Sequence, residues 1–247
     1  MKTFIPGLVI TALFFPFLAQ AKETLRNSYV SEVDANLTIK TMSVLPSSDN
    51  VNGLYSRFVE SKLGNLVSES HRFGLVDVKD VDPRLTVENY SEQPGTIRSL
   101  GQKNQTDSFL VAKISKNGKK LSIRLDLYLS KDGNLLASES LEDDPRFEMA
   151  DVEKRISELF EKVVDKIPYK GLVLSRQAQR VTIDLGSLDG ITNDSILTVE
   201  HIISVKRHPK FNFILTSEKE IIGRIKVLKT EPKLSFAVIL QEKEKGV

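Results

Sequence analysis

Two β-turn signals, each set between runs of alternating hydrophobicity, constrain the fold of this 247-residue chain more than any other feature. Asn117-Gly118 and Asp132-Gly133 separate the runs "SFLVAKIS", "LSIRLDLYL" and "LLASESL". Asn-Gly and Asp-Gly suit type I′ turns because both central residues adopt positive φ. In the middle run, every second residue across 121–129 is apolar. The pattern predicts a three-stranded antiparallel meander with one buried face.

A helix between two strands is predicted before the meander. "LTIKTMSVLP" (37–46) has the pattern of a strand, and the polar cluster "SSDN" (47–50) after it can cap a helix. Across 51–70, apolar residues recur at three- and four-residue spacing, which predicts an amphipathic helix. "RFGLVDV" (72–78) follows as a second strand. Because a helix connects the two strands, we expect them to be parallel.

A further helix is predicted after the meander. Asp144-Pro145 supplies a cap and a first-turn proline, the apolar stripe covers 152–167, and Pro168 ends the helix. Residues 80–106 carry little pattern and are interpreted mostly as loop, with a short helix at 96–105 as an option. Residues 37–168 therefore predict one α/β domain that contains a sheet with helices.

The sequence pattern changes after Pro168. Short β-rich runs replace the helical period, with turns at 186–190, 208–209 and 231–232. Five or six short strands within 169–247 predict a small closed barrel, because closure removes exposed strand edges. The stretch "RVTIDLGSLDGITNDSILTV" at 180–199 carries glycines and aspartates and is interpreted as strand, turn and strand.

The first 21 residues have the pattern of a signal peptide. Lys2 precedes an apolar run at 5–18, and Ala19-Gln20-Ala21 supplies the small-x-small pattern of a cleavage site. A membrane-spanning helix is the alternative, but a span needs about 20 apolar residues, and this run is shorter and twice broken by proline. We expect cleavage after Ala21, export, and a linker or exposed segment at 22–36.

Composition narrows the compartment and the class of partner. The chain has no cysteine, so it lacks the lipid-attachment residue of bacterial lipoproteins and forms no disulfide. An exported chain without cysteine suits a bacterial periplasm. Its 35 basic and 33 acidic side chains nearly balance, and tryptophan is absent. The sequence therefore predicts no lipid anchor and no nucleic-acid partner, which would need a concentrated basic field.

No set of catalytic or cofactor-binding residues stands out. The sequence contains no nucleophile elbow and no phosphate-binding glycine loop. A zinc site needs converging ligands at short spacing, unlike the three histidines, His71, His201 and His208. The 180–199 stretch has aspartates at turn spacing rather than calcium-loop spacing: Asp184, Asp189 and Asp194. We expect no catalytic residue, no metal and no cofactor, and therefore no enzyme.

Two charged clusters are candidate functional surfaces. Glu142, Asp143 and Asp144 would serve either as paired carboxylates of a hydrolase or as a cap on the following helix. A basic cluster lies within the long segment 204–219, and long loops commonly carry binding residues. It fits an acidic partner, a glycan or lipid head groups, with simple solubility as the alternative. The candidate interaction residues are Lys206, Arg207, His208 and Lys210.

Two family resemblances agree with this organisation. "MSVLP", "SHRFGLVDV" and the meander resemble the amino-terminal α/β domain of the Tol-Pal protein TolB, and related modules of curli-assembly and peptidoglycan-synthase-activator lipoproteins. "GLVLSRQAQRVTIDLGSLDGITNDSILTV" and "IIGRIKVLKTEPKLSFAVI" resemble the carboxy-terminal SH3-like barrel of flagellar assembly protein T, in which a TolB-like module also precedes the barrel. The implied fold class is α+β in two domains, 37–168 and 169–247. That family has a further amino-terminal domain, for which only residues 22–36 are available here.

The resemblance implies a non-enzymatic periplasmic adaptor or assembly protein. Its partners would be other periplasmic or outer-membrane-associated proteins, such as those of a flagellar-type ring. One alternative is a regulator of an envelope enzyme such as a peptidoglycan synthase, and another is a hydrolase that uses Glu142, Asp143 and Asp144. The sequence leaves the partner, the binding surface and the oligomeric state open.

Overall fold

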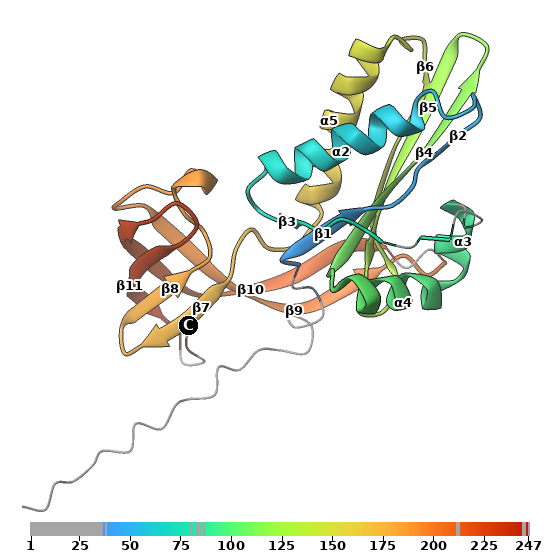
Figure 1. The fold of residues 1–247 in the computed structure, drawn as a ribbon. Helices are drawn as coiled ribbons and strands as arrows, with labels where there is room; N and C mark the ends of the chain where they lie inside the picture. Colours follow the sequence, from blue (N-terminus) through green and yellow to red (C-terminus); the bar gives the residue numbers. More distant parts are fainter. Residues whose placement is uncertain are drawn as a thin grey trace, which may run out of the picture.

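The structure is a computed structural model. It describes residues 37, 39–79, 81–82, 85, 87–210, 213–243 and 246. The predicted signal peptide (1–21), its cleavage residues Ala19 and Ala21, and the segment 22–36 lie outside these residues. Within them, no helix is long and apolar enough to span a membrane. The elements form two sheets, the first with helices and the second without an α-helix (Figure 1).

The first sheet is mixed and contains the predicted meander. Its order is β3-β1-β4-β5-β6, with β2 paired to β4. β1 runs parallel to β3 and to β4, whereas β4, β5 and β6 are antiparallel. The strands are β1 (Thr41–Val44), β2 (Ser48–Asp49), β3 (Gly74–Leu75), β4 (Ser108–Asn117), β5 (Lys120–Leu129) and β6 (Leu135–Asp144). The meander and the parallel pair are confirmed, although β3 is shorter than the strand predicted at 72–78.

Helices cover both faces of the first sheet. α2 (Ser56–Glu69) and α5 (Met149–Asp165) pack over the leucine-rich face of β5, where Leu125 and Leu127 are fully buried. α3 (Val87–Glu92) and α4 (Pro94–Asn104) cover the other face, on which Asp126 and Tyr128 are buried too. The prediction of a single buried face is therefore wrong. The covering helices lie in residues 80–106, for which the sequence predicts mostly loop with an optional helix at 96–105. α4 confirms that helix, whereas α3 was not predicted.

The polar cluster at 47–50 caps α2 through Asp49. The carboxylate of Asp49 accepts hydrogen bonds from the backbone amides of Val51, Gly53, Tyr55 and Ser56 at 2.8–2.9 Å. Burial alone would raise the pKa of Asp49, but these four amide hydrogen bonds outweigh it and lower the pKa below the usual value. The predicted cap is confirmed only in part, because Asp49 binds one helix amide, that of Ser56, and the helix begins at Ser56 rather than at 51. The charge on Asp49 mainly holds the turn that leads into the helix.

The cap predicted at Asp144-Pro145 is wrong. Asp144 is the last residue of β6, and α5 begins only at Met149. The Asp144 carboxylate accepts hydrogen bonds from the guanidinium groups of Arg146 at 2.9 Å and of Arg155 at 3.0 Å. A buried carboxylate needs such partners, so Asp144 ties the end of the sheet to the following helix instead of capping it.

The second sheet is antiparallel, with the order β7-β8-β11-β10-β9. Its strands are β7 (Val173–Gln177), β8 (Arg180–Ile183), β9 (Ile196–Arg207), β10 (Ile214–Thr230) and β11 (Ser235–Glu242). β7 and β9 are its two edges, so the described strands do not close into the predicted SH3-like barrel. A small core of buried side chains lies between them: Val181, Ile183, Ile225, Val227 and Ala237.

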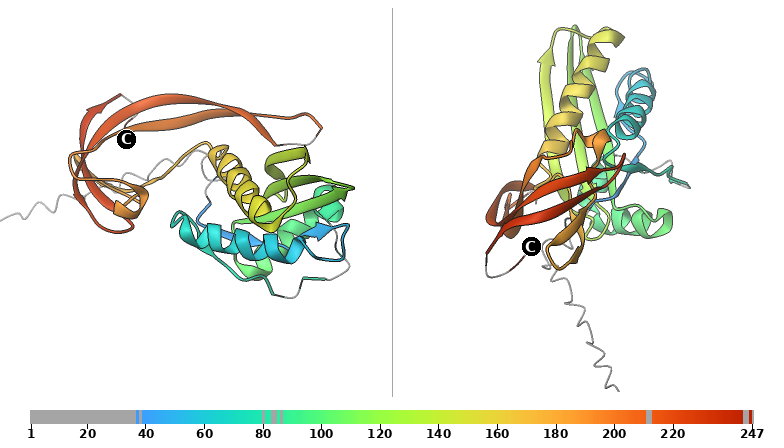
Figure 2. Two further views of the ribbon diagram at one scale, coloured as in Figure 1. Left: turned by 90° about the horizontal axis from the view of Figure 1, so that it is seen from above. Right: turned by 90° about the vertical axis from the view of Figure 1, so that its left-hand side faces the viewer.

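The two longest strands of the second sheet extend beyond their neighbours. β11 pairs with β10 only from Gly223 onward, whereas residues 200–207 of β9 and 214–221 of β10 pair only with each other. We call these two paired stretches the arm. The arm runs from the second sheet to the first (Figures 1 and 2), where Ile202 and Ile214 are buried in the first sheet's core. The arm therefore contacts both sheets, and the domain division at 168/169 stays a prediction.

Candidate interaction sites

The four predicted interaction residues lie at the end of the arm and in the turn beyond it. Arg207 ends β9, and the turn beyond it is held by the backbone amide of His208, which donates to the carbonyl of Phe213 at 2.9 Å. The rings of His208 and Phe213 stack with centroids 5.0 Å apart. The amide of Lys210 donates to Nδ1 of His208 at 3.2 Å, while the Lys206 and Lys210 side chains are exposed. The structure therefore gathers these four residues on one hairpin end, where His208 shapes the turn.

The two faces of the arm differ in exposure. Ile202 and Ile214 are only 4% and 6% exposed because they pack in the first sheet's core, with Val205 beside them. Ile203 and Leu215 are 49% and 56% exposed. The β9–β10 pairing shifts its register at both of these residues, and there the outward face of the arm presents aliphatic side chains next to a basic end. The sequence analysis did not predict this face, although the adjacent isoleucines at 202 and 203 within one strand indicated that both of its faces carry aliphatic side chains.

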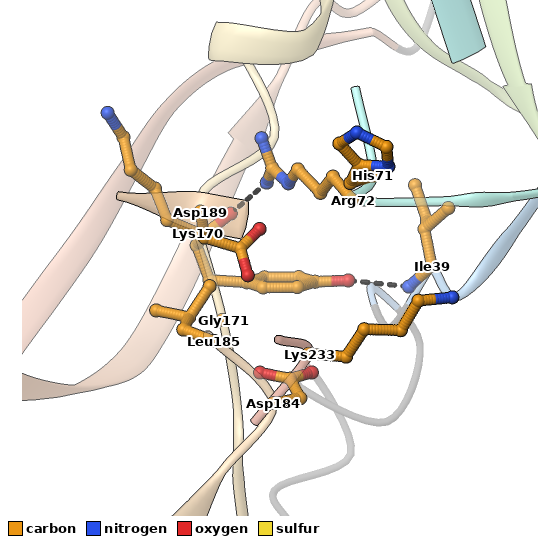
Figure 3. A pocket seen from close by; sticks show the side chains of 10 residues that line it. Ile39, His71, Arg72, Lys170, Gly171, Asp184, Leu185, Asp189 and Lys233 are labelled. Carbon is orange, nitrogen blue, oxygen red and sulfur yellow. Dashed lines mark hydrogen bonds between the residues drawn. The ribbon is translucent and has the colours of Figure 1, made fainter. Parts of the chain in front are cut away.

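A small pocket lies where the first sheet meets the second (Figure 3). It has a volume of about 40 Å³, and its lining includes Ile39, Arg72, Tyr169, Asp184 and Lys233. The backbone amide of Ile39 donates to the Tyr169 hydroxyl at 2.5 Å, and that hydroxyl donates to the carbonyl of Leu37. The guanidinium of Arg72 donates to the carbonyl of Tyr169. Burial raises the pKa of Tyr169 to about 12, so the hydroxyl stays protonated and able to donate at neutral pH.

The charged side chains around this pocket interact with the segment that connects the two sheets. Asp184 accepts a hydrogen bond from the amide of Leu172 at 2.5 Å, and burial raises the pKa of its carboxyl. Arg72 is half-buried near Asp165, Asp184 and Asp189, and burial lowers its pKa. With a volume near that of one or two waters, the pocket fits a structural junction better than a substrate site.

The aspartates of the 180–199 stretch do not converge on one point. Asp189 accepts a hydrogen bond from the amide of Gly186 at 2.7 Å, and Gly190 follows it with a φ of +79°. Asp194 instead forms an ion pair with Lys226 at 2.8 Å. Among the described residues, no group of His, Asp and Glu is arranged to hold a metal ion. Each aspartate has a turn or pairing role that its own neighbours explain.

The acidic cluster and the histidines are dispersed as well. Asp144 faces two arginines, whereas Asp143 pairs with Lys120 at 3.3 Å, so these two carboxylates are held by different cations. Glu142 is exposed on β6. His71 lines the junction pocket, His201 lies on β9 and His208 at the end of the arm. The structure does not bring the residues of the hydrolase hypothesis to a common point.

Comparisons with known proteins give limited likenesses. No family model matches the chain, and no curated protein matches it. It is similar to the PelC dodecamer from Paraburkholderia phytofirmans, at 11% identity over 56% of this chain and 89% of that one, with a TM-score of 0.34. It is also similar to the LpoB C-terminal domain from Escherichia coli, at 14% identity over 42% of this chain and 82% of that one, with a TM-score of 0.31. A third similar structure is TolB from Acinetobacter baumannii, at 13% identity over 85% of this chain and 61% of that one, with a TM-score of 0.37. At these values the likenesses assign neither family nor partner.

Proposed function

We propose that this protein is a non-enzymatic adaptor of the bacterial cell envelope that binds other periplasmic or outer-membrane-associated proteins through the arm. Export rests on the signal pattern at 1–21. The binding role rests on the arm, a two-stranded hairpin with exposed aliphatic side chains beside a basic end.

The outward face of the arm is the observation that carries this proposal. Ile203 and Leu215 are each about half exposed, at 49% and 56%. Lys206 and Lys210 are exposed at the same end of the hairpin. Aliphatic side chains next to a charged rim are typical of protein interfaces, in which apolar area supplies affinity and charge supplies orientation. The partner surface would therefore be apolar with an acidic border.

A flagellar-ring-type assembly is the specific complex that the sequence resemblance favours, with the second sheet standing where that family has its SH3-like barrel. Regulation of a peptidoglycan synthase is the alternative. Deletion of the coding sequence separates them: loss of motility with intact cell-wall synthesis supports the first. Stimulation of a purified synthase by the full mature chain supports the second.

Site-specific photo-cross-linking in living cells tests the arm. A photoreactive residue at Leu215 should form one dominant adduct with an envelope protein, and Ile203→Asp in the same chain should abolish it. A photoreactive residue at Lys119, exposed in the β4–β5 turn, is the matched control and should form no such adduct. Equal adducts from Lys119 and Leu215, or none from Leu215, would contradict the proposal.

A further inference from the structure

A second surface, separate from the arm, lies at the β3 edge of the first sheet. A groove of about 360 Å³ opens there, lined by Val44 and Pro46 at the end of β1, by Glu60 and Gly64 of α2, and by residues 75–78 and 81. α2 packs alongside β3 and β1 at this edge (Figure 1). The volume lies within the range of ligand-binding sites in proteins, in contrast to the junction pocket.

The backbone beside the groove is open to pairing. The amides of Gly74 and Val76 donate inward, to the carbonyls of Lys40 at 2.8 Å and Met42 at 3.0 Å. Because backbone groups alternate in direction along a strand, the amides of Leu75 and Asp77 point away from β1. β3 is the last strand on this side among the described residues. An edge of this kind accepts an added strand.

Gly64 keeps the floor of the groove clear. It lies in the interior of α2, where glycine costs about 1 kcal/mol relative to alanine. A Cβ at this position would meet only Cδ2 of Leu75, at an ordinary contact distance of 3.9 Å. Packing within the chain therefore does not require glycine. A side chain here would project toward Leu75, into the space that the side chains of a strand added to β3 would occupy.

The charge of the groove is acidic. Glu60 and Asp77 line it, and no Lys, Arg or His is among its described lining residues. Glu60 is half-buried, and its carboxylate accepts one hydrogen bond, from the amide of Ser47 at 2.7 Å. Burial raises the pKa of Glu60, although Ser47 and the nearby Arg57 partly oppose the shift. A cation brought into the groove would compensate this carboxylate further.

We propose that the groove binds an extended segment of a partner protein in which aliphatic residues and a lysine or arginine alternate on one side. The segment pairs with the outer edge of β3. Its aliphatic side chains pack against Val44, Pro46 and Val78, and its cationic side chain reaches Glu60. This inference is independent of the arm, because the groove and the arm lie on different elements.

A peptide titration followed by two-dimensional NMR of the full mature chain tests the groove. The probe is acetyl-Ser-Val-Ser-Lys-Ser-Val-Ser-amide, which places Val, Lys and Val on one side of a strand, and the control peptide carries Glu in place of Lys. The lysine peptide should shift the amides of Glu60, Leu75 and Asp77 at millimolar concentration. The glutamate peptide should bind at least about tenfold more weakly, a difference of about 1.4 kcal/mol.

Three variants decide the interpretation. Gly64→Leu should block the groove and abolish the shifts, with its fold checked by the remaining spectrum. Glu60→Gln keeps the shape of the groove and should remove the preference for the lysine peptide over the glutamate peptide. This variant tests the inference even if Gly64→Leu does not fold. Lys206→Glu, on the arm, should bind the peptide as the wild type does. Equal binding of both peptides, unchanged binding by Gly64→Leu, or no shift with the lysine peptide would each overturn the inference.

Discussion

The two sheets bury apolar surface to different extents. Helices cover both faces of the first sheet, and its core includes large side chains that are completely enclosed, such as Leu127 and Phe109. The second sheet has a core of five small or medium side chains. Several of its aliphatic and aromatic residues are 40% exposed or more, among them Phe236 and Leu240.

The second sheet therefore relies on its contacts with the first. Its buried core of five side chains is small, and a small core gives only marginal stability. Two attachments supply the rest. Ile202 and Ile214 of the arm enter the first sheet's core, and the Tyr169 hydroxyl joins the connecting segment to the backbone before β1. Four substitutions test this difference between the two sheets.

Phe160→Ala in α5 should have the largest effect. Phe160 is 1% exposed within the first core, and its loss should lower the free energy of unfolding by about 3–5 kcal/mol. Because the arm shares that core, far-UV circular dichroism in urea should show the whole chain unfolding earlier. Phe236→Ala in β11 is the matched control, since Phe236 is 42% exposed, and it should cost less than about 1 kcal/mol. Equal costs would remove the distinction between the two regions.

Ile202→Ala should loosen the arm at a cost of about 2 kcal/mol, because Ile202 is 4% exposed at the contact with the first core. The neighbouring Ile203→Ala should cost less than about 1 kcal/mol, since Ile203 is 49% exposed. Hydrogen exchange should show faster opening of 200–207 and 214–221 in the first variant alone. Matching exchange rates in both would mean that the arm is held by other contacts.

Tyr169→Phe should cost about 1 kcal/mol, because it removes one hydroxyl that both accepts and donates a hydrogen bond. The variant should also change how the free energy of unfolding depends on pH above pH 10. The pKa of Tyr169 is raised from its usual value near 10 to about 12, so between these pH values the unfolded tyrosine has lost its proton and the folded one has not. Stability conferred by the protonated hydroxyl is present below pH 10 and lost as the pH rises toward 12. Urea titrations across that window should show a shallower decline for the variant than for the wild type.

Gly64→Ala should have the smallest effect and the opposite sign. The added methyl group meets only Leu75 at 3.9 Å, and alanine favours the helix by about 1 kcal/mol or less. The midpoint of thermal unfolding should rise slightly. A lower midpoint would show that α2 and β3 lie closer together than this spacing allows, and would remove one support for the groove.

Local patterns predicted the elements whose determinants are close in sequence. The Asn-Gly and Asp-Gly turns specified the meander, and the cluster at 47–50 specified the cap on α2 through Asp49. The candidate residues Lys206, Arg207, His208 and Lys210 were found because they form one short basic run. The groove was not predicted, because Val44, Glu60 and Leu75 are brought together only when α2 packs on β1 and β3.

By itself the sequence determined the periodicities, the turns and the export pattern, since each depends on neighbours a few residues apart. The tertiary structure alone decided how far each surface is covered. The sequence predicts Asp144 as a helix cap, but in the fold its carboxylate pairs with Arg146 and Arg155. The sequence also predicts a separate barrel, but Ile202 and Ile214 of its strands are buried in the core of the first sheet. The physical reason is that a buried charge or an apolar side chain is stabilised by whichever partner reaches it in space, and nearby sequence does not specify that partner.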